Sequence, residues 1–112
     1  MMAIVALLLT IATPRYLHSV ERARESALRS SLLVMRDAID RFAGDRGRYP
    51  DSLDELVASR YLRTLPEDPL TGRRDSWLQL APPPDALVPG KLADVRSSAA
   101  GRGRDGGLYA EW

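Results

Sequence analysis

The sequence contains no cysteine among its 112 residues and only one histidine, His18. Without cysteine, the chain has no disulfide framework, no thiolate zinc site and no cysteine nucleophile. A lone histidine on a predicted helix is usually structural or solvated rather than catalytic. No serine lies in a G-x-S-x-G turn, and no glycine-rich phosphate loop follows a predicted strand. We therefore expect no enzymatic activity.

An apolar run long enough to cross a bilayer is also missing. Residues 2–17 read MAIVALLLTIATPRYL, and the apolar part ends at Thr13. It falls about seven residues short of the roughly 20 that a membrane-spanning helix needs. Three interpretations are open: a complete transmembrane helix, a cleaved signal, or an apolar helix whose first turns precede Met1. We favour the third, because no basic region precedes the run as it would in a signal peptide.

Length and charge limit the number of domains and the kinds of partner that we expect. A chain that is 45% apolar and 28% charged over 112 residues is typical of one small globular domain with an appendage. The formal net charge is only +1. Neither half of the chain is basic enough to indicate nucleic-acid binding, so we do not expect a nucleic-acid partner.

Apolar periodicity predicts one long helix that begins in the apolar run. We expect Pro14 to kink this helix without ending it, and Gly44 to Gly47 to stop it. Beyond Pro14, an amphipathic stretch of about 28 residues is expected. Its apolar stripe recurs at steps of four and three through Leu28, Leu32, Met35, Ile39 and Phe42, and Leu17 and Val20 continue it toward Pro14.

The opposite side of this helix carries arginines seven residues apart, at Arg22, Arg29 and Arg36. Spacing of four residues predicts ion pairs from Glu25 to Arg29, Arg36 to Asp40 and Asp37 to Arg41. A solvated charged face is the main interpretation. The alternative is a stripe that contacts phosphates or lipid headgroups, with Arg15 at its membrane end.

The remainder of the chain predicts short elements. SLDE at residues 52–55 matches a capping box, in which Ser52 and Glu55 cap each other's amides at the start of a second helix. That helix is expected to bury Leu53, Leu56 and Val57, and LPEDPLTG at residues 65–72 is expected to be a rigid loop. Strands are predicted over residues 77–80, 92–96 and 108–112, with SSAAGRGRDGG as a loop before the third. The predicted fold class is α+β, with a long N-terminal helix packed on a small antiparallel sheet of about three strands.

These motifs resemble a known family. MAIVALLLTIATPRYL is similar to the N-terminal helix of type IV pilin-like proteins. RYP at residues 48–50, LPEDPLTG, a following Trp and the terminal Glu-Trp are similar to the G-type major pseudopilin of type II secretion systems. The resemblance implies a leader cut by a prepilin peptidase, a methylated first residue and an early glutamate. All three would lie upstream of Met1, so we expect the N-terminus to be truncated.

The resemblance also implies a location and partners. Residues 1–14 would form the membrane and fibre-core part, with Leu7, Leu8, Leu9, Ile11 and Pro14 in that helix. Residues 15–112 would form a pilin-like domain in the periplasm, anchored once in the bacterial inner membrane. The subunit would polymerise with copies of itself and would also contact minor pseudopilins. An inner-membrane assembly platform would add the subunits to the fibre.

A calcium site in the C-terminal loop is a further implication of the resemblance. Asp105 would supply a carboxylate, and Ser97 and Ser98 would supply hydroxyls or carbonyls, with Glu111 as an additional ligand. Arg102 and Arg104 depart from the family pattern, because cation binding favours acids there. The alternative is a metal-free loop in which Asp105 and Gly106 simply form a turn.

Two other functions stay open on the sequence alone. A minor pilin or competence pseudopilin would bind DNA phosphates through its arginines. A membrane-anchored periplasmic adaptor would use the apolar segment as an anchor and never polymerise.

Overall fold

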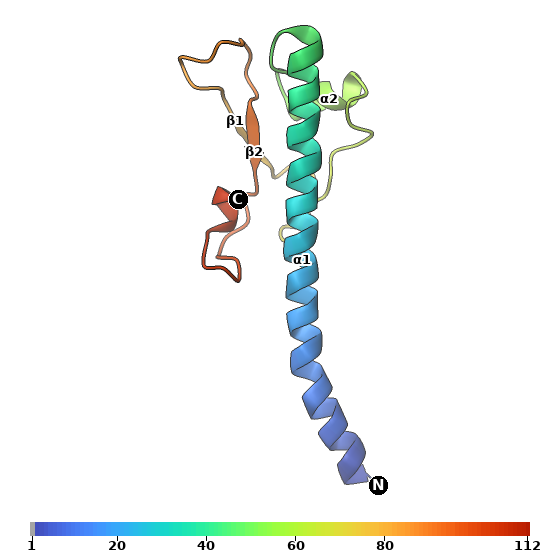
Figure 1. The fold of residues 1–112 in the computed structure, drawn as a ribbon. Helices are drawn as coiled ribbons and strands as arrows, with labels where there is room; N and C mark the ends of the chain where they lie inside the picture. Colours follow the sequence, from blue (N-terminus) through green and yellow to red (C-terminus); the bar gives the residue numbers. More distant parts are fainter. Residues whose placement is uncertain (1) are drawn as a thin grey trace.

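The computed structural model describes the backbone of residues 2–112 and the side chains of residues 19–112. The chain forms α1 (Met2–Arg46), α2 (Leu53–Ala58), β1 (Leu78–Leu80), β2 (Asp94–Arg96) and the 3-10 helix η1 (Tyr109–Glu111). The molecule measures 68 × 28 × 19 Å. Its length comes from α1, whose N-terminal part projects beyond all other elements (Figure 1). The fold class is therefore α+β, as predicted.

Helix α1 runs through Pro14 without interruption and curves in its N-terminal half (Figure 1). Its end agrees with the predicted stop. Gly47 has a φ of 70°, a left-handed conformation that glycine adopts without a steric penalty. The Gly47 amide donates to the Ala43 carbonyl at 2.9 Å and so closes the last turn. Within residues 19–112, whose side chains the structure describes, no helical segment combines the length and hydropathy of a candidate membrane span.

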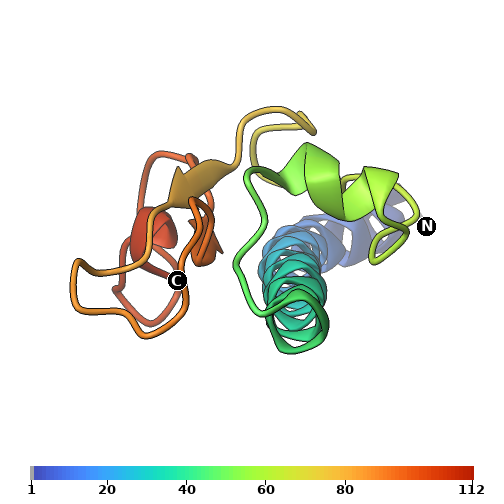
Figure 2. The same ribbon diagram turned by 90° about the horizontal axis from the view of Figure 1, so that it is seen from above.

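The core lies between the C-terminal half of α1 and the short elements that cover it. Seen along the helix, α2 and the two-stranded sheet flank α1 on adjoining sides (Figure 2). The predicted stripe is buried from Leu28 onward, with Phe42 fully inaccessible. Its members pack against apolar residues of α2, β2 and the loops, namely Leu53, Leu56, Leu62, Trp77, Leu92 and Val95. Burial of this stripe explains why a short chain can form a folded unit.

The sheet has two strands instead of about three. β1 pairs antiparallel with β2, with Leu78 opposite Arg96 and Leu80 opposite Asp94. The prediction of a strand over residues 108–112 is wrong, because this stretch forms η1 and meets residue 102 only through an isolated bridge at Leu108. The amides of Glu111 and Trp112 donate to carbonyls within their own segment and do not form a ladder.

The RYP stretch after α1 lies against a later loop. The Tyr49 amide donates to the Pro89 carbonyl at 2.7 Å, and the Leu92 amide donates to the Pro50 carbonyl at 2.9 Å. Gly90 sits between these two bonds, where a Cβ would come within 2.5 Å of the Tyr49 Cβ. Only glycine therefore fits at this crossing.

The start of α2 differs from the predicted capping box. Ser52 makes no side-chain cap hydrogen bond, although it occupies the N-cap position. Glu55 Oε1 instead accepts the Asp51 amide and a guanidinium hydrogen of Arg48, both at 2.9 Å. The guanidinium of Arg48 competes for the Glu55 carboxylate, which therefore does not cap Ser52. Of the three residues predicted to be buried by this helix, Leu53 and Leu56 are buried and Val57 is half-buried.

Candidate functional site

The C-terminal segment, residues 97–112, is the part of the chain in which a ligand site was predicted, and it begins at a buried pair. Asp68 in the LPEDPLTG loop and Ser97 are both fully buried. The Ser97 hydroxyl donates to Asp68 Oδ2 at 2.5 Å, and Asp68 Oδ1 accepts the Leu70 amide at 2.8 Å. Ser97 Oγ also accepts the Ala99 amide at 3.1 Å. The LPEDPLTG loop and the C-terminal segment are therefore joined by a buried side-chain hydrogen bond, and both of its side chains also accept backbone amides.

Arg36 connects α1 to the sheet and to the end of the chain. Its Nε donates to Asp94 Oδ1 at 2.8 Å. One terminal nitrogen donates to the carbonyl oxygens of Val95 and Trp112, each at 2.9 Å. The side chain is 30% exposed. A guanidinium has five donors in a fixed plane, so one arginine can hold three acceptors from two segments.

Glu25, eleven residues earlier on α1, holds the same segment through its carboxylate. Its Oε1 accepts the Arg104 amide at 2.9 Å and the Tyr109 hydroxyl at 3.2 Å. Burial raises the pKa of the Tyr109 hydroxyl, and the hydrogen bond to the negative Glu25 raises it further. Tyr109 is therefore a neutral donor under ordinary conditions.

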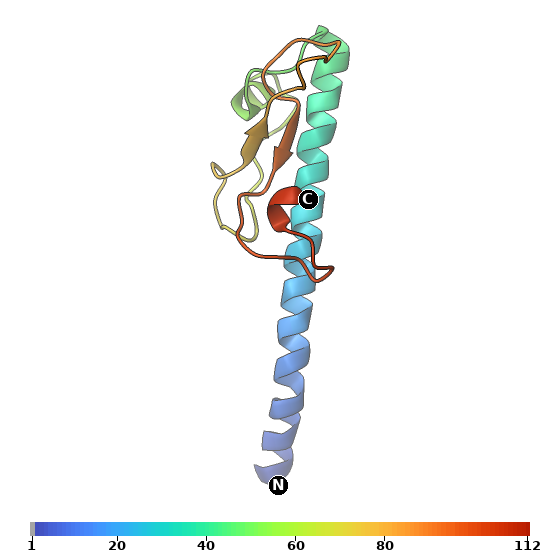
Figure 3. The ribbon, with the colours of Figure 1, turned by 90° about the vertical axis from the view of Figure 1, so that its left-hand side faces the viewer.

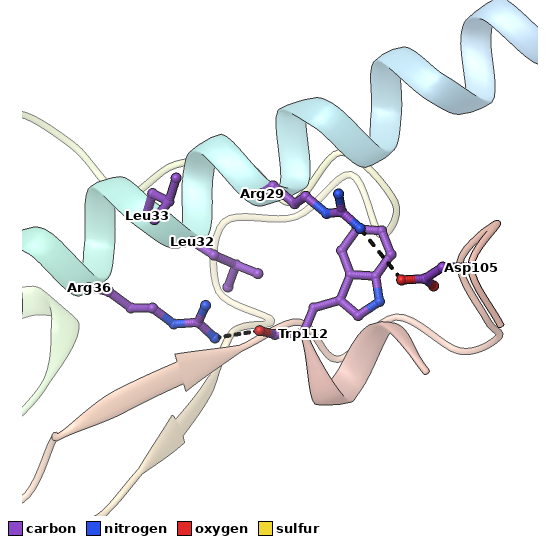
Figure 4. Close-up of a pocket in the computed structure, with 6 residues that line it drawn as sticks. All are labelled: Arg29, Leu32, Leu33, Arg36, Asp105 and Trp112. Atoms are coloured by element: carbon purple, nitrogen blue, oxygen red, sulfur yellow. Dashed lines mark hydrogen bonds and ion pairs between the residues drawn. The ribbon is translucent and has the colours of Figure 1, made fainter. Parts of the chain in front are cut away.

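Arg29 lies between these two residues and faces Trp112 and Asp105. Its guanidinium carbon is 4.4 Å from the Trp112 ring centroid, and a terminal nitrogen is 3.6 Å from Asp105 Oδ2. A hollow of about 380 Å³ opens beside this stack, lined by Arg29, Leu32, Leu33, Arg36, Asp105 and Trp112 (Figure 4). Leu33 is 66% exposed at its rim, which is high for a leucine.

The three predicted calcium ligands do not share one arrangement. Ser97 is buried against Asp68, Ser98 is exposed, and Asp105 faces Arg29. Asp105 Oδ1 also accepts the Gly107 amide at 3.0 Å, in the turn that was the metal-free alternative. Among the described side chains, no group of three or more His, Asp and Glu could hold a metal ion. The calcium loop stays a prediction of the resemblance, and these donors do not fit it.

The arginine face of α1 is only partly the solvated face that was predicted. Arg22 is exposed, whereas Arg36 and Arg29 contact the C-terminal segment. Of the three predicted ion pairs along the helix, the described residues form the one between Asp37 and Arg41, at 3.0 Å. Arg36 pairs with Asp94 rather than with Asp40, and in this position its guanidinium also reaches the carbonyls of Val95 and Trp112.

The predicted fibre and membrane residues Leu7, Leu8, Leu9, Ile11 and Pro14 lie in the N-terminal part of α1. Their backbone is helical, and their side chains lie outside the described ones. No other element runs beside this part of α1 in either side view (Figures 1 and 3). The apolar sequence of residues 2–13 therefore lies in a helical segment that extends away from the folded unit.

Comparison with known proteins adds no name to this arrangement. No family model matches the chain, and no curated protein or solved structure shows significant similarity to it.

Proposed function

We propose that the chain is the structural subunit of a type II secretion pseudopilus with a pilin-like fold. In this role, the projecting half of α1 anchors the subunit in the bacterial inner membrane and then lies in the core of a short periplasmic fibre. The observation that carries the proposal is a continuous 45-residue helix that is covered only along its C-terminal half.

The physics of the apolar run supports assembly. A helix that leaves lipid has to bury its apolar surface, and the same run on further copies offers the matching surface. Close packing of such helices supplies dispersion and replaces contact with lipid tails. Membrane anchoring and fibre formation therefore use the same residues, Leu7, Leu8, Leu9 and Ile11, at two stages.

The folded end of the molecule supports a structural rather than a catalytic role. Several described titratable groups pair with one another, as Arg48 does with Glu55 and Arg73 with Asp75. The hollow between α1 and the C-terminal segment holds two arginines and one aspartate, with no nucleophile beside a base. Such a surface suits contact with further subunits, with minor pseudopilins or with an inner-membrane assembly platform.

A matched pair of variants tests the proposal. Leu8→Asp places a charge in the projecting helix, and Leu87→Asp places the same charge on a loop residue that is fully exposed. Both are produced in cells together with the assembly machinery of a type II secretion system, and sheared fibres are collected by sedimentation and viewed by electron microscopy.

We expect fibres from the original chain and from Leu87→Asp, and none from Leu8→Asp, because a charge in an apolar helix bundle is costly. Absence of fibres from the original chain, with the protein folded and membrane-bound, would favour a non-polymerising adaptor. Fibres of equal abundance from Leu8→Asp would contradict the proposed role of the apolar run.

A further inference from the structure

The C-terminal segment is held on α1 by charged side chains at the place where the resemblance predicts calcium. Calcium takes six to eight oxygen ligands, usually including two or more carboxylates. The segment offers only Asp105 and Glu111 as carboxylates, and it carries Arg102 and Arg104 beside them. Arg102 is exposed and donates to the Gly106 carbonyl of its own loop at 2.8 Å.

Cationic groups already lie against the acceptors of this segment. Arg29 faces the Asp105 carboxylate, and Arg36 holds the Trp112 carbonyl together with the Val95 carbonyl (Figure 4). Glu25 completes the arrangement with the opposite charge, because it accepts the Arg104 amide and the Tyr109 hydroxyl. These three side chains of α1 form what we call the α1 clasp: Glu25, Arg29 and Arg36.

We infer that the guanidinium groups of the α1 clasp order the C-terminal segment in place of a bound divalent cation. An arginine fork satisfies carbonyl and carboxylate oxygens from different segments, which is the structural task of a calcium ion in a loop. The segment then folds with α1 in the single chain, and its order needs no metal. This inference concerns the monomer and stands apart from the proposed assembly.

The members of the clasp contribute unequally. Arg29 is 61% exposed and its ion pair with Asp105 is loose, so that pair alone contributes little. Its position over the Trp112 ring adds a cation–π contact. Arg36 is less exposed and donates three hydrogen bonds, two of them to backbone carbonyls. Loss of Arg36 should therefore loosen the segment more than loss of Arg29.

Metal binding is tested directly with terbium, which takes calcium sites and emits when a nearby tryptophan is excited. Trp112 lies beside the Asp105 turn, so an ion held by Asp105 would be sensitised by its ring. We expect no sensitised emission from the full chain, and the same amide exchange across residues 97–112 in excess calcium as in EGTA. Emission that disappears in Asp105→Asn, or exchange that calcium slows about tenfold, would overturn the inference.

The clasp is tested with three glutamine variants of α1 arginines. Arg36→Gln should speed amide exchange of residues 97–112 by about tenfold, and Arg29→Gln should have a smaller effect. Arg22→Gln is the matched control, because it removes an exposed arginine for which the described residues show no ion pair. Equal exchange in Arg36→Gln and Arg22→Gln would overturn the inference.

A salt series keeps the test decisive if Arg36→Gln fails to fold. Raising the ionic strength should speed exchange of the segment in the original chain, because the charges of the clasp are partly exposed and screened. The same series on Arg29→Gln should show a weaker dependence on salt. Exchange that is independent of salt in the original chain would contradict a segment held by charge.

Discussion

The two halves of α1 differ in what surrounds them. From Leu28 to Phe42, an apolar stripe is buried by α2, the sheet and the loops between them. From residue 2 to residue 18, the same helix runs on with no element beside it (Figure 3). Under the proposed function, the projecting half finds its partner in the membrane and then in further copies of the chain. The same helix is packed within the chain at one end and, under the proposed function, between molecules at the other.

The largest expected effect on folding comes from the packed half. Phe42 is fully buried, and its ring and that of Tyr61 form a T-shaped pair with 5.4 Å between centroids. Phe42→Ala should lower the free energy of unfolding by about 3–5 kcal/mol, measured by urea denaturation. Leu87→Ala, on a fully exposed side chain, is the control and should change it by less than about 0.5 kcal/mol. Similar values for both variants would contradict the assigned core.

A smaller loss is expected where the LPEDPLTG loop meets the C-terminal segment. Ser97→Ala removes the partner of Asp68 Oδ2 and leaves the Ala99 amide without its acceptor. The free energy of unfolding should fall by about 1–3 kcal/mol, because buried polar groups left unpaired lose their hydration without compensation. Ser98→Ala is the matched control on an exposed neighbour, and an equal effect of both would contradict the buried bond.

The pH dependence of folding should show a weak contribution from Glu55. The hydrogen bond from Arg48 lowers the pKa of the Glu55 carboxyl below its ordinary value of 4.5. Stability from this pair is therefore present above that ordinary value and is lost as pH falls through the lowered pKa. Glu55→Gln should flatten the acid limb of a stability–pH curve slightly, because both side chains are partly exposed. An unchanged acid limb would contradict the pair.

The smallest effect on monomer folding is expected in the projecting half. Ile11→Asp should change the free energy of unfolding of the folded end by less than about 0.5 kcal/mol, because no element of the same chain lies beside this part of α1. Urea denaturation monitored by the buried Trp77 gives this value. A loss as large as that of Phe42→Ala would place residue 11 in the monomer core and remove the contrast between the two halves.

Local pattern was sufficient to predict the elements that depend on neighbours in sequence. The stripe from Leu28 to Phe42, the stop at Gly47 and the passage through Pro14 follow from periodicity and backbone preference, and the structure agrees. The predicted loop at residues 65–72 is also a loop. These features need no knowledge of which distant segments meet.

The candidate site depended on distant partners and was harder to predict. Nothing near Arg36 in sequence indicates Asp94 or the Trp112 carbonyl, 58 and 76 residues away. The helical spacing to Asp40 was the only local signal, and it pointed to the wrong acid. Glu55 likewise pairs with Arg48 and not with Ser52. The segment 108–112 contains a 3-10 helix and adds no strand to the two-stranded sheet. For Asp68, the sequence contains one local signal, because an aspartate directly before a proline and a turn often accepts backbone amides of that turn.

The most direct test of the assembly role is disulfide cross-linking along the projecting half of α1 in cells that carry a type II secretion assembly platform. The chain has no cysteine, so only introduced thiols can react. Single variants such as Leu8→Cys should stop at dimers, whereas pairs such as Val5→Cys with Ile11→Cys join each subunit to two neighbours. A ladder of covalent oligomers from the paired variants, with dimers alone from the single ones, is the result that a fibre subunit predicts. Monomers throughout a series of such pairs, in protein that is folded and membrane-bound, would contradict it.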